Sequence, residues 1–138
     1  MRVLVQRVKH ASVEVDKQIV GSINNGLLLL VGFTEGDDQE KINYMVKKVI
    51  NLRIFDDNNG VMNLSVKDID GSILSVSQFT LYGDASKGNR PSYINALKGE
   101  ESIKLYDEFN VSIYAQSIVE KGQRRNESVF HNGYGSLT

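Results

Sequence analysis

Side chains able to do chemistry gather in the stretch SVSQFTLYGD, residues 75–84. The hydroxyls of Ser77 and Thr80 and the amide of Gln78 lie there within a largely apolar run. If this stretch is a strand, Gln78 and Thr80 project from the same face, because alternate residues of a strand share a face. Such a pair fits a polar ligand at the end of a strand, or equally the polar face of an ordinary half-buried strand. The pattern alone leaves both interpretations open.

A catalytic nucleophile in this stretch would need a base. A threonine hydroxyl is a weak nucleophile unless a neighbouring group activates it. The two histidines, His10 and His131, have no carboxylate at a spacing that suggests a relay. If the chain performs acyl transfer, we therefore expect substrate positioning and backbone N–H groups that stabilise an oxyanion, rather than a side-chain triad.

Metal and thiol chemistry find little support in the sequence. The chain has no cysteine, which excludes disulfides, thiolate catalysis and Cys-based zinc sites and suits a reducing compartment. The segment FDDNNG resembles a calcium-binding loop, but its register places Phe55 at the first ligand position. We interpret this segment as a turn between strands.

Length, composition and charge limit the class of protein. The 138 residues, of which 41% are hydrophobic and 24% charged, fit one globular domain. No apolar run approaches the roughly 18 residues of a membrane span, and the alternating MRVLVQRV lacks the apolar core of a signal peptide, so we expect a cytoplasmic protein. A net charge of −1 argues against a global basic field for nucleic acid. The side chains that we expect to contact phosphate locally are Lys87, Arg90 and Lys98. The alternative is that these are solvated loop charges without a ligand.

Hydrophobic periodicity predicts the secondary structure. Alternating segments predict strands near the N-terminus, over about 12–20, and at LRIF, VMNLSV and GSILSVSQFTLY, while GLLLLVGF predicts a strand buried on both faces. A helical period predicts helices over about 38–51, capped by Asp37 and Glu40, and over about 100–116. The second helix should bury the stripe Ile103, Tyr106, Phe109 and Ile113.

These elements predict one fold class and one long loop. The expected fold is an α/β (α+β) domain over residues 1–138, with a mostly antiparallel or mixed sheet, or a barrel-like core, and two covering helices. The polar segment GDASKGNRPSY, around the single proline Pro91, is long for a loop in a compact domain, and such loops often carry function.

Five segments of the chain occur in the order typical of one family: RVLVQRVKHASVEVD, GLLLLVG, NLRIFDDNNGVMNLSV, SVSQFTLYGD and KGNRPSY. Over residues 1–122 the chain resembles the D-aminoacyl-tRNA deacylases, also called D-Tyr-tRNA deacylases. The resemblance implies hydrolysis of the ester that joins a D-amino acid to the 3′ end of tRNA. It also implies a cytoplasmic homodimer with each active site near the subunit interface, no metal or organic cofactor, and neither DNA nor a membrane as partner.

The resemblance also assigns residues to the site. The S-Q-F-T motif of the family falls on Ser77, Gln78, Phe79 and Thr80. The resemblance assigns Gln78, Phe79 and Thr80 to the catalytic site and Ser77, Arg7 and Gly135 to substrate binding. The Phe79 backbone N–H is expected to stabilise the oxyanion, and Thr80 is expected to be a pocket residue rather than the nucleophile. The resemblance implies that backbone groups and the terminal 2′-hydroxyl of the tRNA assist water. Arg7 matches an arginine that supports the site.

The tail, residues 123–138, departs from the family pattern. Members carry N-x-G-P-x-T, whose cis Gly–Pro carbonyls screen substrate chirality from the other subunit. Gly135 aligns with the glycine of that motif, but Ser136 stands where proline belongs. A cis bond before a residue other than proline costs about 2.5–4 kcal/mol, so we expect this tail not to present the same carbonyls. A frameshift after about Gln123 is one hypothesis for the difference.

Three functions follow, and tRNA experiments separate them. A D-aminoacyl-tRNA deacylase releases D-tyrosine from D-Tyr-tRNA and spares L-Tyr-tRNA. A non-catalytic tRNA- or RNA-binding homologue binds tRNA without turnover. A homo-oligomeric structural domain binds no tRNA at all.

Overall fold

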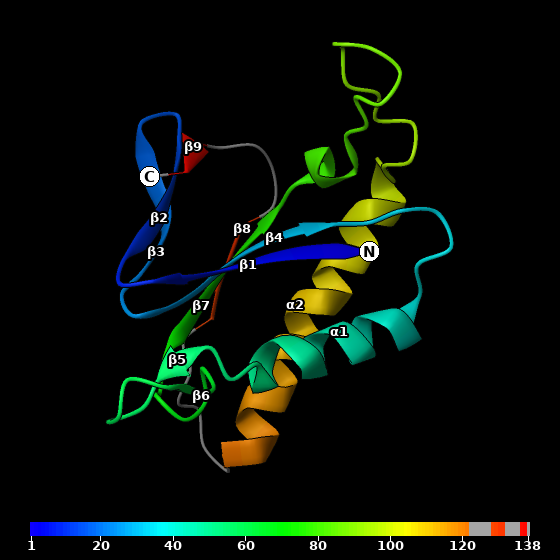
Figure 1. The fold of residues 1–138 in the computed structure, drawn as a ribbon. Coiled ribbons are helices and arrows are strands. Elements are labelled where there is room, and N and C mark those ends of the chain that lie inside the picture. The colour runs from blue at the N-terminus through cyan, green and yellow to red at the C-terminus, as the bar shows by residue number, and fades with distance from the viewer. Residues whose placement is uncertain (122–127, 132–135, 138) are drawn as a thin grey trace.

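The chain folds around a mixed four-stranded sheet in the order β1-β4-β7-β8 (Figure 1). The computed structural model describes residues 1–121, 128–131 and 136–137, and the side chains of residues 1–116. The strands are β1 (Arg2–Val8), β4 (Gly26–Gly32), β7 (Ser72–Ser77) and β8 (Ser128–His131). β1 runs antiparallel to β4, whereas β4, β7 and β8 run parallel to one another. The carboxyl ends of these parallel strands therefore meet at one edge of the sheet.

The helices α1 (Gln39–Asn51) and α2 (Glu100–Lys121) pack against one face of this sheet (Figure 1). Both predicted helices are confirmed, but two details of the prediction are wrong. The cap of α1 is Asp38, whose carboxylate accepts the Lys41 N–H at 3.0 Å, because Asp37 instead accepts the Thr34 N–H at 2.7 Å. In α2, Ile103 is 53% exposed and does not join the buried stripe of Tyr106, Phe109 and Ile113.

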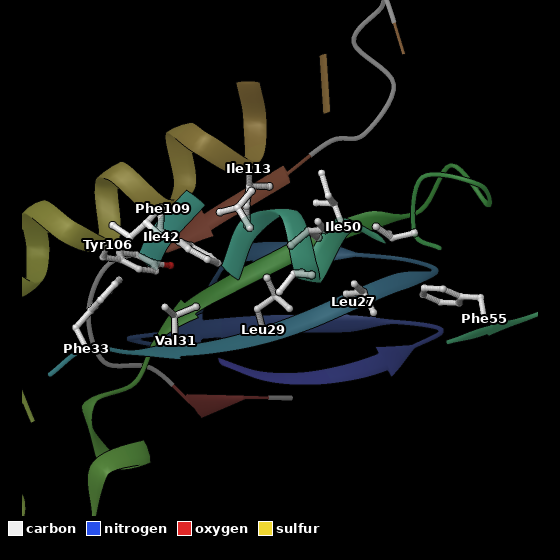
Figure 2. Packing of buried hydrophobic residues seen from close by; sticks show 14 residues of the cluster. Leu27, Leu29, Val31, Phe33, Ile42, Ile50, Phe55, Tyr106, Phe109 and Ile113 are labelled. Atoms are coloured by element: carbon white, nitrogen blue, oxygen red, sulfur yellow. The ribbon is translucent and has the colours of Figure 1, made fainter. Parts of the chain in front are cut away.

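The main core lies between the sheet and the helices (Figure 2). Leu27, Leu29 and Val31 of β4 point toward the helices, where they meet side chains of both. The helical side chains of this cluster that Figure 2 labels are Ile42, Ile50, Tyr106, Phe109 and Ile113. Full burial of each large aliphatic side chain stabilises the fold by about 1.5–3 kcal/mol relative to exposure. The sheet and the two helices are thus held as one body.

A β-hairpin covers the opposite face of the sheet. It consists of β2 (Ala11–Val15) and β3 (Gln18–Ile23), and β9 (Ser136–Leu137) pairs with β2. The prediction of one extended segment over 12–20 is wrong, because Asp16 and Lys17 both have positive φ (51° and 64°) and form a two-residue turn. The second cluster buries residues of this hairpin against the sheet: Ala11, Val13, Ile23, Leu28, Leu74 and Val76. β4 is therefore buried on both faces, as its continuous apolar run predicts.

A short hairpin follows α1 and consists of β5 (Phe55–Asp56) and β6 (Met62–Leu64). The turn predicted from FDDNNG is confirmed. The Asp57 carboxylate accepts the backbone N–H groups of Asn59 at 2.8 Å and Val61 at 3.1 Å, which fixes the turn.

Candidate active site

The motif residues 77–80 lie where β7 ends and a short 3₁₀ helix, η1 (Phe79–Tyr82), begins. The prediction of a strand through Tyr82 is wrong. The Gln78 N–H donates to the Val31 carbonyl at 2.7 Å, and the Gly83 N–H then donates to the Thr80 carbonyl at 2.9 Å, which closes the turn. Gln78 and Thr80 still meet, because the Gln78 side-chain amide donates to the Thr80 hydroxyl. The turn, rather than the two-residue period of a strand, brings them together.

Two glycines allow η1 to lie close to its neighbours. A Cβ at Gly32 would approach the Gln78 carbonyl oxygen to 2.9 Å and the Leu81 Cβ to 3.3 Å. A Cβ at Gly83 would approach the Tyr93 ring to 3.0 Å. These contacts are closer than side chains normally tolerate, so a larger residue at Gly32 would displace the turn that carries Phe79 and Thr80.

Arg2 holds the far end of η1. Its guanidinium donates to the Leu81 carbonyl at 2.8 Å and lies 4.5 Å from the centroid of the Tyr82 ring. Tyr82 is only 8% exposed, and desolvation by burial, with a contribution from the Asp37 carboxylate, raises the pKa of its phenol. The tyrosine therefore stays neutral and offers an aromatic face to the cation. The sequence analysis missed Arg2, and its position at the start of an alternating strand gave no signal for this role.

A pocket of about 290 Å³ opens at the carboxyl edge of β4 and β7. Crevices at this edge of parallel strands are the usual binding sites of such sheets. The ends of the two strands, η1 and the start of α2 supply its walls. The lining residues include Gly32, Phe33, Ser77, Phe79, Lys98, Gly99, Ser102 and Ile103. Two of the motif residues, Ser77 and Phe79, thus face one cavity.

The aromatic ring of Phe79 is fixed by two neighbours. The Tyr93 ring meets it edge to face with the centroids 5.2 Å apart, and the Lys98 Nζ lies 5.2 Å from its centroid. Tyr93 belongs to the segment after Pro91, and Lys98 precedes α2. The wall of the pocket is therefore assembled from three separate stretches of chain.

A buried polar cluster joins β7 to α2 next to the pocket. The Ser75 hydroxyl lies 3.1 Å from both the Tyr106 hydroxyl and the Asn110 side-chain oxygen, and the Tyr106 hydroxyl also donates to the Ser75 carbonyl at 2.8 Å. Such buried, satisfied networks fix one packing arrangement. This one holds α2 at a set position relative to the strand that ends in Ser77.

The pocket offers positioning groups rather than a catalytic base. Among its described lining residues, Lys98 is the one with a titratable side chain. In the part of the chain that the structure describes, no group of three or more His, Cys, Asp or Glu residues could hold a metal ion. The described helices also lack the combined length and apolar character that a membrane span requires. The chemistry that fits these walls is stabilisation of a developing negative charge on a bound substrate.

The structure does not bring Arg7 to this pocket within one chain. Arg7 pairs with Leu27, at the start of β4, whereas Arg2 pairs with Gly32 at its end. The Arg7 guanidinium donates to the Ile54 carbonyl at 2.8 Å and lies 3.7 Å from the Asp56 carboxylate. Gly135, the residue of the tail that the resemblance assigns to the site, lies outside the described residues.

A larger hollow lies elsewhere, along the outer surface of α2 near the first residue of α1. Its volume is about 640 Å³, and it contains none of the residues 77–80. Three of its lining residues are acidic: Glu100, Asp107 and Glu108. Despite its size it lacks the motif residues, so the smaller pocket at the strand ends is the candidate active site.

Comparison with known sequences identifies the class of this protein. The sequence profile of the family described as D-Tyr-tRNA(Tyr) deacylase matches residues 4–132. Three relatives are each named D-aminoacyl-tRNA deacylase. The one from an Exiguobacterium species is 52% identical over 89% of this chain and 84% of its own length. Those from Clostridium novyi and Clostridium tetani are 55% and 58% identical over 79% of this chain and 73% of theirs.

Solved structures agree with this fold. A structure described as c-Myc DNA Unwinding Element Binding Protein superposes with a TM-score of 0.87 at 32% identity, over 99% of this chain and 89% of that one. A second, described as a probable eukaryotic D-amino acid tRNA deacylase, superposes with a TM-score of 0.77 at 16% identity, over 99% and 91%. The second supports the fold alone. The chain belongs to the D-Tyr-tRNA(Tyr) deacylase family, a family of hydrolases that act on the ester bond of aminoacyl-tRNA.

Proposed function

We propose that this chain hydrolyses D-aminoacyl-tRNA in the pocket between Ser77, Phe79 and the start of α2. Family membership supports the reaction. The names of the relatives favour it over the alternative of a non-catalytic RNA-binding homologue. The observation that carries the choice of site is the pocket itself, because it lies at the carboxyl edge of β4 and β7 and is lined by two residues of the S-Q-F-T motif. Translation supplies charged tRNA in the cytoplasm, which is where we place the activity.

In the proposed reaction, water attacks the carbonyl carbon of the ester. The carbonyl oxygen gains negative charge, which the Phe79 backbone N–H stabilises, and the 3′-oxygen of the terminal ribose leaves with a proton. The products are a free D-amino acid and free tRNA. The resemblance to the family implies that the neighbouring 2′-hydroxyl of the substrate assists the water. The described lining residues agree with this assignment, because they include no histidine or carboxylate. Gln78 and Thr80 do not line the pocket themselves, and we assign them the role of holding the turn that carries Phe79.

We also propose that two copies complete each site. Arg7 lies at the end of β1 remote from η1, so one chain alone cannot place it beside Phe79. In a two-fold dimer, the end of one protomer that carries Arg7 would face the turn of its partner. The exposed aliphatic side chain of Leu4, 53% accessible on β1, is consistent with a surface that a second copy covers.

The direct test is deacylation of D-Tyr-tRNA and L-Tyr-tRNA by the purified chain. We expect release of D-tyrosine and little release of L-tyrosine. Binding of tRNA without turnover would contradict the proposal. Ser136→Pro restores the proline of the family motif, and we expect it to sharpen discrimination between the two substrates. Equal discrimination in both chains would show that this position does not screen chirality.

Thr80→Ala separates a pocket residue from a nucleophile. We expect a less than tenfold fall in kcat, because the hydroxyl makes no covalent bond to the substrate. Loss of a catalytic nucleophile would reduce kcat by a factor of about 10⁴ or more. A fall of that size would overturn the proposed mechanism.

Mixing two variants tests the shared site. Arg7→Met and Gly32→Val each remove one of the two proposed walls. If each site combines both protomers, mixed dimers contain one intact site, and a one-to-one mixture should regain about a quarter of wild-type activity. A mixture no more active than the separate variants, with exchange verified by mass spectrometry, would place each site within one chain.

A further inference from the structure

A basic groove lies at the carboxyl end of α1, away from the proposed site. Its volume is about 350 Å³. Lys47, Lys48 and Arg53 contribute three cations to its lining, and no carboxylate lines it among the described residues. The other lining residues are Tyr44, Asn51 and Leu52. On a chain with a net charge of −1, this is a locally concentrated positive surface.

The cations of the groove are available to a ligand. Neither Lys47 nor Lys48 forms an ion pair with a carboxylate of the described residues. Arg53 uses its Nε to donate to the Asn63 carbonyl at 2.9 Å, which orients the guanidinium and leaves its other N–H groups. Tyr44 is 65% exposed, and the Lys48 Nζ lies 5.9 Å from its ring centroid. The guanidinium and ammonium groups can bind phosphate, and the exposed aromatic ring beside them can contact a ribose.

Stabilisation of the helix explains only part of this arrangement. Cations in the last turn of a helix interact favourably with its dipole, and Lys48 lies in that turn. Arg53 lies beyond the helix, and an exposed tyrosine adds nothing to the dipole interaction. The larger hollow along α2 is lined by three carboxylates, Glu100, Asp107 and Glu108, and one cation, Lys104. Its net negative charge disfavours a polyanion there, whereas the described lining of the groove carries only positive charges.

We propose that this groove binds phosphates of the base-paired acceptor stem of the substrate tRNA. This proposal rests on the proposed function. The 13 residues of α1 extend about 20 Å, from near the end of β4 to the groove. The single-stranded 3′ end enters the pocket, so the paired stem begins several nucleotides away, at a distance of that order. The groove supplies affinity for the tRNA body and takes no part in ester cleavage.

The test compares two substrates and two double variants. Lys47→Glu/Lys48→Glu reverses two of the three positive charges of the groove. Lys9→Glu/Lys17→Glu makes the same change in charge at exposed positions on other parts of the surface. We expect the groove variant to raise KM for D-Tyr-tRNA about tenfold or more at low salt, with kcat unchanged. Hydrolysis of D-tyrosyl-adenosine, which has no stem, should be unaffected. The slope of log(kcat/KM) against log[salt] should become shallower by about 2.

Several results would overturn the proposal that the groove binds the acceptor stem. Equal KM values for the two double variants on D-Tyr-tRNA would do so while leaving the deacylase function intact. If the wild-type chain failed to hydrolyse either substrate, the proposed function would fail, and binding of uncharged tRNA would still test the groove. An unchanged affinity of the groove variant for uncharged tRNA would then reject the acceptor-stem proposal. Loss of self-association with unchanged tRNA affinity would identify the groove as a contact between copies, which also rejects the proposal.

Discussion

The two arginines of β1 have opposite surroundings. Arg2, at one end, donates to the Leu81 carbonyl and lies over the Tyr82 ring, so it contacts the turn that carries the motif. Arg7, at the other end, contacts the Ile54 carbonyl and Asp56, next to the short β5–β6 hairpin. One end therefore supports the turn whose Phe79 lines the pocket. The other end lies away from the pocket of its own chain and would reach a pocket only in the proposed dimer.

This difference separates two ways of supporting a site. Residues near Arg2 fix the position of η1 inside one protomer, so their replacement should change catalysis in every assembly state. In the proposed dimer, residues near Arg7 would act on the site only across the interface. Variants at the two ends should therefore differ in how strongly their activity depends on the association of the chain.

The largest expected effect is at Gly32. Gly32→Val places side-chain atoms where a Cβ alone would already come within 2.9 Å of the Gln78 carbonyl oxygen. A displacement of about 1 Å in a catalytic group reduces rates by a factor of about 100, so we expect kcat for D-Tyr-tRNA to fall at least that far. The circular dichroism spectrum should stay close to that of the wild type. Ala115→Val, which adds bulk at an exposed position of α2, is the control. A kcat near wild type in Gly32→Val would show that η1 is not constrained by β4.

A smaller effect is expected at Arg2. Arg2→Met removes both the hydrogen bond to the Leu81 carbonyl and the cation over Tyr82, and we expect kcat to fall about 5- to 20-fold with little change in KM. Arg2→Lys keeps the charge and should recover part of the loss. A fall in thermal stability without a change in kcat would identify Arg2 as a structural residue only.

The smallest expected effect is the pH dependence of stability that comes from two aspartates, Asp84 near the Arg2 end of β1 and Asp57 near the Arg7 end. Backbone hydrogen bonds from Val61 and Asn59 lower the pKa of Asp57, and hydrogen bonds from Ser86 lower the pKa of Asp84 below the ordinary value of 3.8. A lowered folded-state pKa stabilises the fold above the unfolded-state pKa, and this contribution disappears as pH falls through the folded-state value. The melting temperature should therefore be insensitive to these groups from pH 8 to about 5 and should fall below about pH 4.

Asparagine substitutions distinguish the two aspartates. Asp57→Asn should reduce the acid-dependent loss of melting temperature more than Asp84→Asn, because Asp57 accepts hydrogen bonds from Asn59, Val61 and Asn63, whereas Asp84 accepts from Ser86. Identical acid profiles for both variants and the wild type would show that neither carboxylate is linked to stability.

Local sequence pattern determined much of this protein. The buried strand β4, the helix α1 and the Asp57 turn follow from apolar runs, helical periodicity and turn residues, all of which act over a few neighbouring positions. The order of the motif segments was enough to predict the family, which the comparisons confirm. The roles of the motif residues 77–80 in the site stay predictions.

The tertiary structure decided the geometry of the candidate site. No local pattern reports that β7 stops at Ser77, because the turn depends on Val31, Gly32 and Arg2, which are far away in sequence. The cap at Asp38 and the exposure of Ile103 likewise depend on what the surrounding chain already contacts. Parallel pairing of β4 and β7 places their ends together and so creates the pocket. Sequence patterns encode the faces that each element buries, whereas a site depends on contacts between elements that only the packed fold brings together.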